Sequence, residues 1–323
     1  MIETRLTRLL DIQHPVISAP MASAAGGALA AAVSSAGALG MIGGAYPNRE
    51  WIDHEFSEAG NTPVGCGFIT WNLTKALEGD PDILTRVLDR KPRALFLSFG
   101  DPSLYSQQIL QSGATLICQV QTLAHAKSAM DCGAQIVVAQ GAEAGGHGRS
   151  RATMTLVPEV ADHIAKNAPD VVLCAAGGIA DGRGLAAALM LGAEGAVIGS
   201  RFWASHEALV HPNMHAAAIS ATGDQTIRST VMDVARRLDW PAGYTARVLQ
   251  NAFTEKWHDN LEGLIADAEA QSEAWMAAWQ SGNVNTANTF VGEVTGLIDQ
   301  VQPAGEIVAT IIAEAEEKLR QFA

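Results

Sequence analysis

The sequence predicts an α/β protein built as a (β/α)8 barrel with a small helical accessory domain inserted into it. Two observations carry this prediction. Over the first two hundred residues, short apolar runs alternate with longer alanine-rich segments, as repeated strand–helix units do. After Phe202 the pattern becomes polar and helical, and a final amphipathic segment follows near the end of the chain.

Eight apolar runs are the predicted strands, and eight parallel strands are enough to close a barrel. They span residues 16–19, 39–42, 64–70, 94–99, 115–120, 136–139, 171–175 and 196–198. Several predicted helices end in a Gly-Ala step that leads into the next strand, at Gly37, Gly113, Gly133 and Gly192. Because glycine readily takes the left-handed conformation that caps a helix, we interpret this repeat as structural rather than catalytic.

Beyond the barrel, the clearest predicted helices span residues 224–237 and 261–280, and a glycine- and asparagine-rich segment follows at 281–288. Trp275 and Trp279 lie one helical turn apart and are interpreted as packing anchors. A last helix, residues 303–322, carries an apolar stripe that we expect to cover the barrel.

We therefore expect two domains. One is a barrel of residues 1–210, completed by the C-terminal helix 303–323. The other is a helical accessory domain of residues 211–302 that covers the active site.

Composition excludes several classes of protein. The net charge of −13 and 21 scattered basic residues argue against a nucleic-acid partner and against an anionic membrane. The four cysteines occur singly, and the histidines show no metal-ligand spacing with carboxylates or cysteines; His211 and His215 lie four apart, but Pro212 follows His211 and no third ligand is near. We therefore expect neither a disulfide framework nor a metal site, and the cytoplasm is the expected compartment. Residues 15–48 are uncharged, but Pro20 and two glycine pairs interrupt them, which argues against a membrane span.

The loops after the seventh and eighth strands predict a phosphate site. The first loop carries Gly177 and Gly178, and the second carries Gly199 and Ser200. Loops at these two places commonly hold phosphate groups in barrels, because glycines let backbone N–H groups approach an anion and a serine adds a hydroxyl donor. The alternative is that these glycines only make tight turns.

The loop after strand six, residues 139–148, contains the candidate catalytic residue. Glycines flank His147 on both sides, so we expect its imidazole to have little packing support and to face the barrel mouth, where it can move protons. Glu143 is a candidate partner, with capping of the loop as the alternative. No GxSxG elbow, Walker loop or strand-linked GxGxxG is present, so hydrolases, phosphotransferases and Rossmann enzymes lack their defining residues.

The ends of other strands supply candidate binding residues. Residues 19–22 end the first strand with a proline turn that exposes backbone groups to the barrel mouth. Gln119 and Gln140 end strands five and six and suit a heteroaromatic ring or ribityl hydroxyls, unless they only satisfy loop backbone. Residues 65–72 are rich in aromatic side chains that either wall a substrate pocket or pack in the core.

Taken together, five segments resemble the nitronate monooxygenase family, formerly called 2-nitropropane dioxygenase. They are residues 14–22, 31–40, 140–147, 176–182 and 199–202. The resemblance implies a TIM barrel that holds non-covalent FMN and oxidises alkyl nitronates, such as propionate 3-nitronate, with O2. The implied products are a carbonyl compound and nitrite.

The resemblance also implies roles for individual residues. His147 would act as a base toward a nitroalkane or as a hydrogen-bond donor to a nitronate. Gly292 and Glu293 resemble a pocket-closing strip. The implied cofactor-binding residues are Ala19, Pro20, Met21, Ala22, Gln119, Gln140, Gly145, Gly146, Gly177, Gly178, Gly199 and Ser200, of which the last four would hold the FMN phosphate.

Two alternatives stay open. Many relatives have lysine where Gln119 stands, and some are NAD(P)H-dependent flavin reductases of the enoyl-acyl-carrier-protein reductase or NADH:quinone reductase type. The second alternative is a flavin-binding barrel without catalytic activity. The expected partners are a small nitronate and O2, and a homodimer is left open.

Overall fold

The computed structural model describes residues 2–321 and confirms the (β/α)8 barrel. Its eight parallel strands follow the order β1-β9-β8-β6-β5-β4-β3-β2. They are β1 (Val16–Ser18), β2 (Met41–Gly43), β3 (Gly65–Ile69), β4 (Ala94–Ser98), β5 (Thr115–Val120), β6 (Ile136–Gln140), β8 (Val172–Ala176) and β9 (Ala196–Ile198). A parallel bridge between Ile17 and Leu39 joins β1 to the chain entering β2 and closes the barrel.

Helices surround the barrel, and the first of them packs its Leu6 and Leu10 with the interior strand residues. They are α1 (Arg5–Leu10), α2 (Gly27–Ser35), α3 (Arg49–Ala59), α4 (Thr70–Gly79), α5 (Ile83–Asp89), α6 (Ser103–Gln111), α7 (Leu123–Asp131), α8 (Thr153–Asn167), α9 (Gly182–Met190) and α10 (Ser200–Trp203). Alternate strand residues, such as Phe96 and Val138, fill the barrel interior, whereas their neighbours, such as Leu97 and Val137, pack against the helices. The barrel is therefore a packed core, and its ligand site lies at the strand ends.

The glycine steps act as the sequence predicts. Gly37, Gly113, Gly133 and Gly192 all have left-handed φ angles, between 85° and 96°. Each follows a helix and leads toward a buried strand, so these glycines set the lengths of the repeating units.

The segment between α10 and the last helix is not purely helical, and two helix predictions there are wrong in part. Residues 224–237 form η1 (Gly223–Gln225), β10 (Thr226–Ser229) and only a short α12 (Val231–Ala235), because β11 (Thr245–Leu249) provides an antiparallel partner for β10. Residues 261–280 form two helices that meet at Asp267. The helices of this segment are α11 (Pro212–Ile219), α13 (Ala252–Trp257), α14 (Leu261–Ala266), α15 (Ala268–Ser281) and η2 (Glu293–Leu297).

A three-stranded sheet joins this segment to the barrel. Its order is β10-β11-β7, and β7 (Gly146–Gly148) comes from the loop after β6. Arg228 of β10 and Arg247 of β11 both donate hydrogen bonds to the carbonyl oxygen of Ala142 in that loop, at 3.1 and 3.0 Å. Burial lowers the pKa of Arg228 to about 10. Two strands of this sheet thus hold the loop that carries His147.

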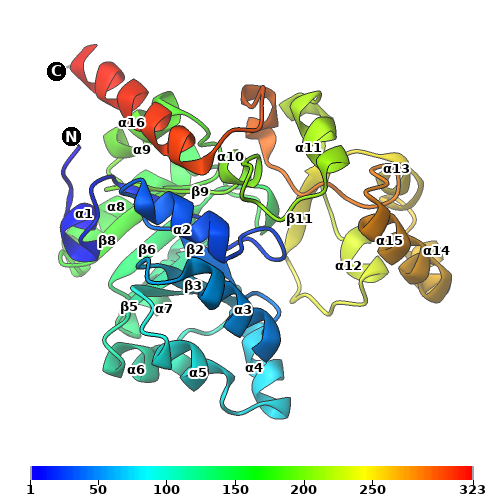
Figure 1. The fold of residues 1–323 in the computed structure, drawn as a ribbon, viewed down its shortest axis with the longest axis horizontal. Coiled ribbons are helices and arrows are strands. Elements are labelled where there is room, and N and C mark those ends of the chain that lie inside the picture. Colours follow the sequence, from blue (N-terminus) through cyan, green and yellow to red (C-terminus); the bar gives the residue numbers. More distant parts are fainter. Residues whose placement is uncertain (1, 322–323) are drawn as a thin grey trace.

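The last helix returns to the barrel. α16 (Ala304–Gln321) packs against α9 and α2, on the side of the molecule opposite α12–α15 (Figure 1). Residues 322 and 323, which the predicted helix includes, lie outside the described residues. The division into domains at residues 210 and 302 stays a prediction.

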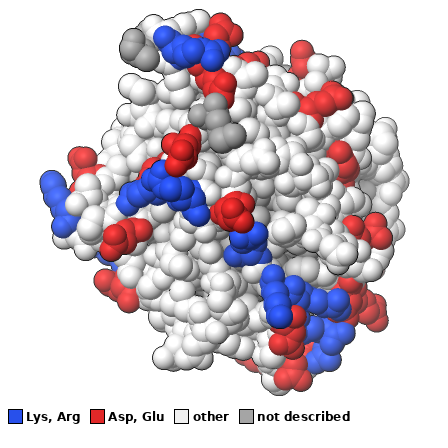
Figure 2. All heavy atoms as spheres, turned by 60° about the vertical axis from the view of Figure 1, so that its left-hand side comes forward, with Lys and Arg blue, Asp and Glu red and all other residues white. Residues whose placement is uncertain are grey.

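The surface carries mixed charge. On the face in Figure 2, basic and acidic side chains adjoin in small groups, and no uniform basic area is visible there. Ion pairs such as Arg5–Glu194 and Arg86–Asp53 connect neighbouring elements. Within residues 2–321, no helix is both long enough and apolar enough to cross a membrane.

A substitution at Gly40 can test how closely α2 packs on the barrel. A Cβ atom at Gly40 would lie 1.8 Å from the carbonyl oxygen of Ala30, which is backbone and cannot move aside cheaply. We expect Gly40→Ala to lower the free energy of unfolding by about 2 kcal/mol or more, as overpacking does. Urea unfolding measures this. Gly79→Ala, where a Cβ meets nothing within 4 Å, should change stability by less than about 1 kcal/mol; equal losses in both variants would contradict the packing account.

Candidate functional site

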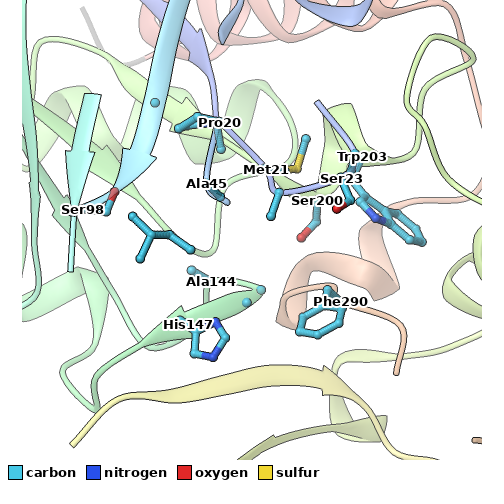
Figure 3. A pocket seen from close by; sticks show the side chains of 18 of the residues that line it. Pro20, Met21, Ser23, Ala45, Ser98, Ala144, His147, Ser200, Trp203 and Phe290 are labelled. Atoms are coloured by element: carbon cyan, nitrogen blue, oxygen red, sulfur yellow. The ribbon is translucent and has the colours of Figure 1, made fainter. Parts of the chain in front are cut away.

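One cavity of about 500 Å³ lies at the carboxyl ends of the barrel strands (Figure 3). A volume of this size is typical of a cofactor or substrate pocket. Gly292 and Glu293 of the expected pocket-closing strip are not among its lining residues. Every predicted catalytic and cofactor-binding residue lines it, namely Ala19, Pro20, Met21, Ala22, Gln119, Gln140, Gly145, Gly146, His147, Gly177, Gly178, Gly199 and Ser200. The fold therefore brings all of them together, while their individual roles stay predictions.

Glycines on β2 and β3 allow the loop after β1 to cross the barrel mouth. A Cβ atom at Gly43 would lie 2.2 Å from the carbonyl oxygen of Met21, and one at Gly67 would lie 2.5 Å from the ring of Pro20. The backbone of residues 19–22 consequently lies at the cavity wall, as the sequence predicts.

The two glycine loops form a cradle with unused donors. Gly177 and Gly178 have φ angles of 93° and 75°, a conformation that favours glycine. Among the described residues, no hydrogen bond uses the backbone N–H groups of Gly177, Gly178, Gly199 or Ser200. Ser200 Oγ accepts from the N–H of Gly292 at 2.9 Å, which leaves its own proton to donate.

The cradle also has space. A Cβ atom at Gly199 would meet only the side chains of Ala19 and Met21, at 3.6 and 3.8 Å. At Gly178 a Cβ would come no closer than 3.6 Å to Glu143. Open space beside unpaired N–H groups is what a bound phosphate requires, so the residues fit the phosphate of the expected FMN.

The two glutamines differ in what they leave for a ligand. Gln140 Oε1 accepts from Gln119 Nε2 at 3.2 Å and from Gln121 Nε2 at 2.9 Å, and Gln140 Nε2 donates to the carbonyl oxygen of His147 at 3.1 Å. Gln140 therefore braces the loop backbone, which was the alternative interpretation of this residue. Gln119 also lines the cavity, and its Nε2 is the atom bonded to Gln140.

Glu143 caps a helix. Its carboxylate accepts from the backbone N–H of Thr153 at 3.0 Å and from the Thr153 hydroxyl at 2.9 Å, at the start of α8. The capping alternative thus describes Glu143, whose two oxygens both accept hydrogen bonds from Thr153.

His147 is well supported, so the prediction of little packing support is wrong. It lies on β7 rather than in an open loop, and its ring stacks on Trp240 with centroids 3.4 Å apart and planes 6° apart. Nε2 lies 2.9 and 3.0 Å from the two carboxylate oxygens of Asp233. Only 8% of the His147 side chain is exposed.

Burial decides the charge of this histidine. The loss of hydration lowers the pKa of His147 below its usual 6.5, although the bond to Asp233 and its negative charge oppose the shift. Arg236 and Arg228 lower the pKa further. At neutral pH the imidazole is therefore uncharged, Nε2–H donates to Asp233, and the lone pair of Nδ1 is the one available to a substrate in the cavity.

Sequence reasoning missed Asp233, Trp240 and Arg236. Asp233 and Arg236 fall within residues predicted as one polar helix, where a carboxylate or guanidinium reads as solvent-exposed. In the structure Asp233 is 4% exposed. The available signal was the apolar setting of Asp233 between Met232 and Val234, which is unusual for an exposed carboxylate.

Aromatic side chains complete the cavity. Trp203, Phe290, Trp275 and Trp279 line it, so the predicted packing anchors also face the pocket. Trp275 and Trp279 stack with centroids 5.3 Å apart. Phe68 of β3 contributes to the wall, as the aromatic-rich end of that strand indicated. Within the described part of the chain, no group of three or more His, Cys, Asp or Glu side chains could hold a metal ion.

Comparison with known proteins gives consistent matches. The family described as nitronate monooxygenase matches residues 3–60 and 68–314. A nitronate monooxygenase of Neurospora crassa is 32% identical over 95% of this chain and 90% of its own length. FabK from Thermotoga maritima is 31% identical, with a TM-score of 0.87 over 99% of this chain and 98% of that chain.

A nitroalkane oxidase from Streptomyces ansochromogenes is 23% identical, with a TM-score of 0.82 over 98% of this chain and 100% of that chain, and it supports the fold alone. The family match spans nearly all of the chain, and the relatives are covered almost end to end. Proteins of the nitronate monooxygenase family are in general flavoproteins that act on a small-molecule substrate with oxygen. This chain belongs to the nitronate monooxygenase family and is an oxidoreductase.

Proposed function

We propose that this enzyme oxidises alkyl nitronates with O2 to a carbonyl compound and nitrite, and that its flavin is FMN. The observation that carries the proposal is the imidazole of His147, which Asp233 and Trp240 hold at the wall of the cavity that contains the glycine cradle. A fixed imidazole with one available nitrogen suits proton transfer to or from a bound substrate.

The unpaired N–H groups at Gly178 and Gly199, with the Ser200 hydroxyl, support a monophosphate at this end of the cavity. When bound, FMN supplies the group that accepts electrons from the substrate. The backbone of residues 19–22 and the amide of Gln119 border the space where a flat ring would lie.

His147 has a defined task toward a neutral nitroalkane. The proton on the carbon beside the nitro group moves to Nδ1 of His147, the C–H electron pair stays on the substrate, and a nitronate results. Asp233 stabilises the imidazolium that forms, because its carboxylate accepts from Nε2. A preformed nitronate needs no such step and meets His147 as a hydrogen-bonding partner.

One experiment separates this function from its alternatives. Purified protein is examined by visible absorption, its released flavin is identified by chromatography, and it is mixed in air with ethyl nitronate or with NADH. The proposal predicts bound FMN and rapid nitrite release. NADH consumption without nitrite would instead indicate a reductase, and a yellow protein with neither activity a flavin-binding barrel.

Removing the imidazole should separate two substrates. We expect His147→Ala to keep its flavin and to lose kcat/KM for nitroethane by about a hundredfold or more, the usual contribution of a general base. The loss with ethyl nitronate should be much smaller, because that substrate is already deprotonated. Steady-state nitrite assays measure both, with the exposed His54→Ala as control. Undiminished nitroethane turnover would remove His147 from this role.

The pH profile tests the pairing with Asp233. Since burial lowers the pKa of His147, kcat/KM for nitroethane should stay level on acidification from pH 7 and decline only below pH 6.5. Asp233 raises that pKa, so Asp233→Asn should move the acid limb to still lower pH as well as reduce the rate. A reduced rate with an unmoved acid limb would mean that Asp233 acts only through the fold.

Filling the cradle tests the phosphate assignment. Gly199→Ala should fold normally, because its Cβ meets only ordinary contacts, yet it should weaken FMN binding by about tenfold or more, since the methyl group occupies space beside the donors. Quenching of flavin fluorescence measures the Kd, with Gly79→Ala as the matched control. An unchanged Kd in Gly199→Ala would contradict the assignment.

A further inference from the structure

Arg236 lies at the cavity wall without a carboxylate partner. The residue follows α12 by one position, one helical turn after Asp233, and its side chain is half-buried. Its guanidinium carbon lies 5.1 Å from the ring centroid of Tyr46, 5.7 Å from that of Trp275 and 5.8 Å from that of Phe290. Aromatic faces hold a cation in place without neutralising its charge.

Three other arginines that are buried or partly buried form hydrogen bonds or an ion pair within the protein. Arg201 donates to the carbonyl oxygen of Gln300, Arg228 to that of Ala142, and Arg247 forms an ion pair with Glu293 at 2.7 Å. Among the described residues, none with a carboxylate lies within ion-pair distance of Arg236. Aromatic side chains hold Arg236, which also forms a side-chain hydrogen bond with Tyr46, so its charge is not offset by a carboxylate.

The two charged side chains of the cavity wall have different partners. Glu143 and Arg236 are the only Asp, Glu, Lys or Arg side chains among the described residues that line it, and the oxygens of Glu143 are bonded to Thr153. The positive charge of Arg236 affects its neighbour Tyr46. Burial raises the pKa of Tyr46, and the charge of Arg236 opposes that rise. In a chain with a net charge of −13, an unpaired cation inside the main cavity favours an anionic ligand.

We propose that Arg236 binds a planar oxyanion of the substrate, either the nitronate group itself or a carboxylate that the substrate carries, and thereby selects anionic over neutral substrates. The planar fork of a guanidinium matches two oxygens on one trigonal atom, and both groups have that shape. Because Asp233 fixes His147 from the same helical turn, the selecting and proton-transferring groups share one support. The inference rests on the proposed function for the identity of the substrate, though not for the anion.

The binding test needs no turnover. Isothermal titration calorimetry of the flavin-loaded enzyme compares butyrate with butyramide, which has the same shape and no charge. We expect butyrate to bind more tightly, and Arg236→Gln to raise its Kd about tenfold or more while leaving that of butyramide within twofold. Arg236→Lys keeps the charge but not the planar guanidinium, so its Kd for butyrate should lie between those of the parent enzyme and Arg236→Gln. Arg237→Gln, at an exposed position, is the control.

Kinetics then distinguish the source of the oxyanion. If Arg236 holds the nitronate group, Arg236→Gln should reduce the ratio of kcat/KM for propyl-1-nitronate over 1-nitropropane. If it holds a carboxylate, only propionate 3-nitronate should lose kcat/KM. Either result supports the inference.

Equal binding of butyrate and butyramide to the parent enzyme, or butyrate binding that Arg236→Gln leaves unchanged, would overturn the inference. If the parent enzyme oxidises no nitronate but binds butyrate in a manner that depends on Arg236, the proposed function is contradicted and this inference stands.

Discussion

The hydrogen bond between His147 and Asp233 is the contact on which the site depends. His147 follows barrel strand β6, whereas Asp233 lies in α12, 86 residues further along the chain. The barrel alone therefore does not complete the arrangement. The pairing of β7 with β11 and the stacking of Trp240 on the imidazole bring both residues to one place, where burial of the ring lowers the pKa of His147.

Close backbone approaches make this geometry achievable. Gly145 and Gly292 lie against each other, and a Cβ atom on either would come within 2.6 Å of the facing backbone. The N–H of Glu293 donates to the carbonyl oxygen of Glu143 at 3.0 Å across the same contact. The segment after α15 thus closes over the His147 loop, and Ser200 of the glycine cradle accepts a hydrogen bond from Gly292 in that segment. Side chains larger than hydrogen at these positions would separate the cradle from the imidazole.

The sequence was sufficient for the barrel and for the residues that line its mouth, because strand runs, helix-capping glycines and loop glycines are local signals. The roles of Gly192 in ending a helix and of Gly199 in a loop could be predicted without knowing which residues contact them in space. The sequence was not sufficient for β10 and α12, because the strand conformation of Thr226–Ser229 depends on a partner strand about twenty residues away. Asp233, Trp240 and Arg236 were missed for the same reason, since only tertiary contacts bury them around His147.

The protonation state of His147 tests the central claim most directly. Nitrogen-15 NMR of histidine-labelled enzyme, assigned with a variant lacking His147, reports which ring nitrogen carries a proton. The account predicts a neutral ring at pH 7, protonated at Nε2 and unprotonated at Nδ1. An imidazolium at pH 7, or a proton on Nδ1 with Nε2 bare, would contradict it.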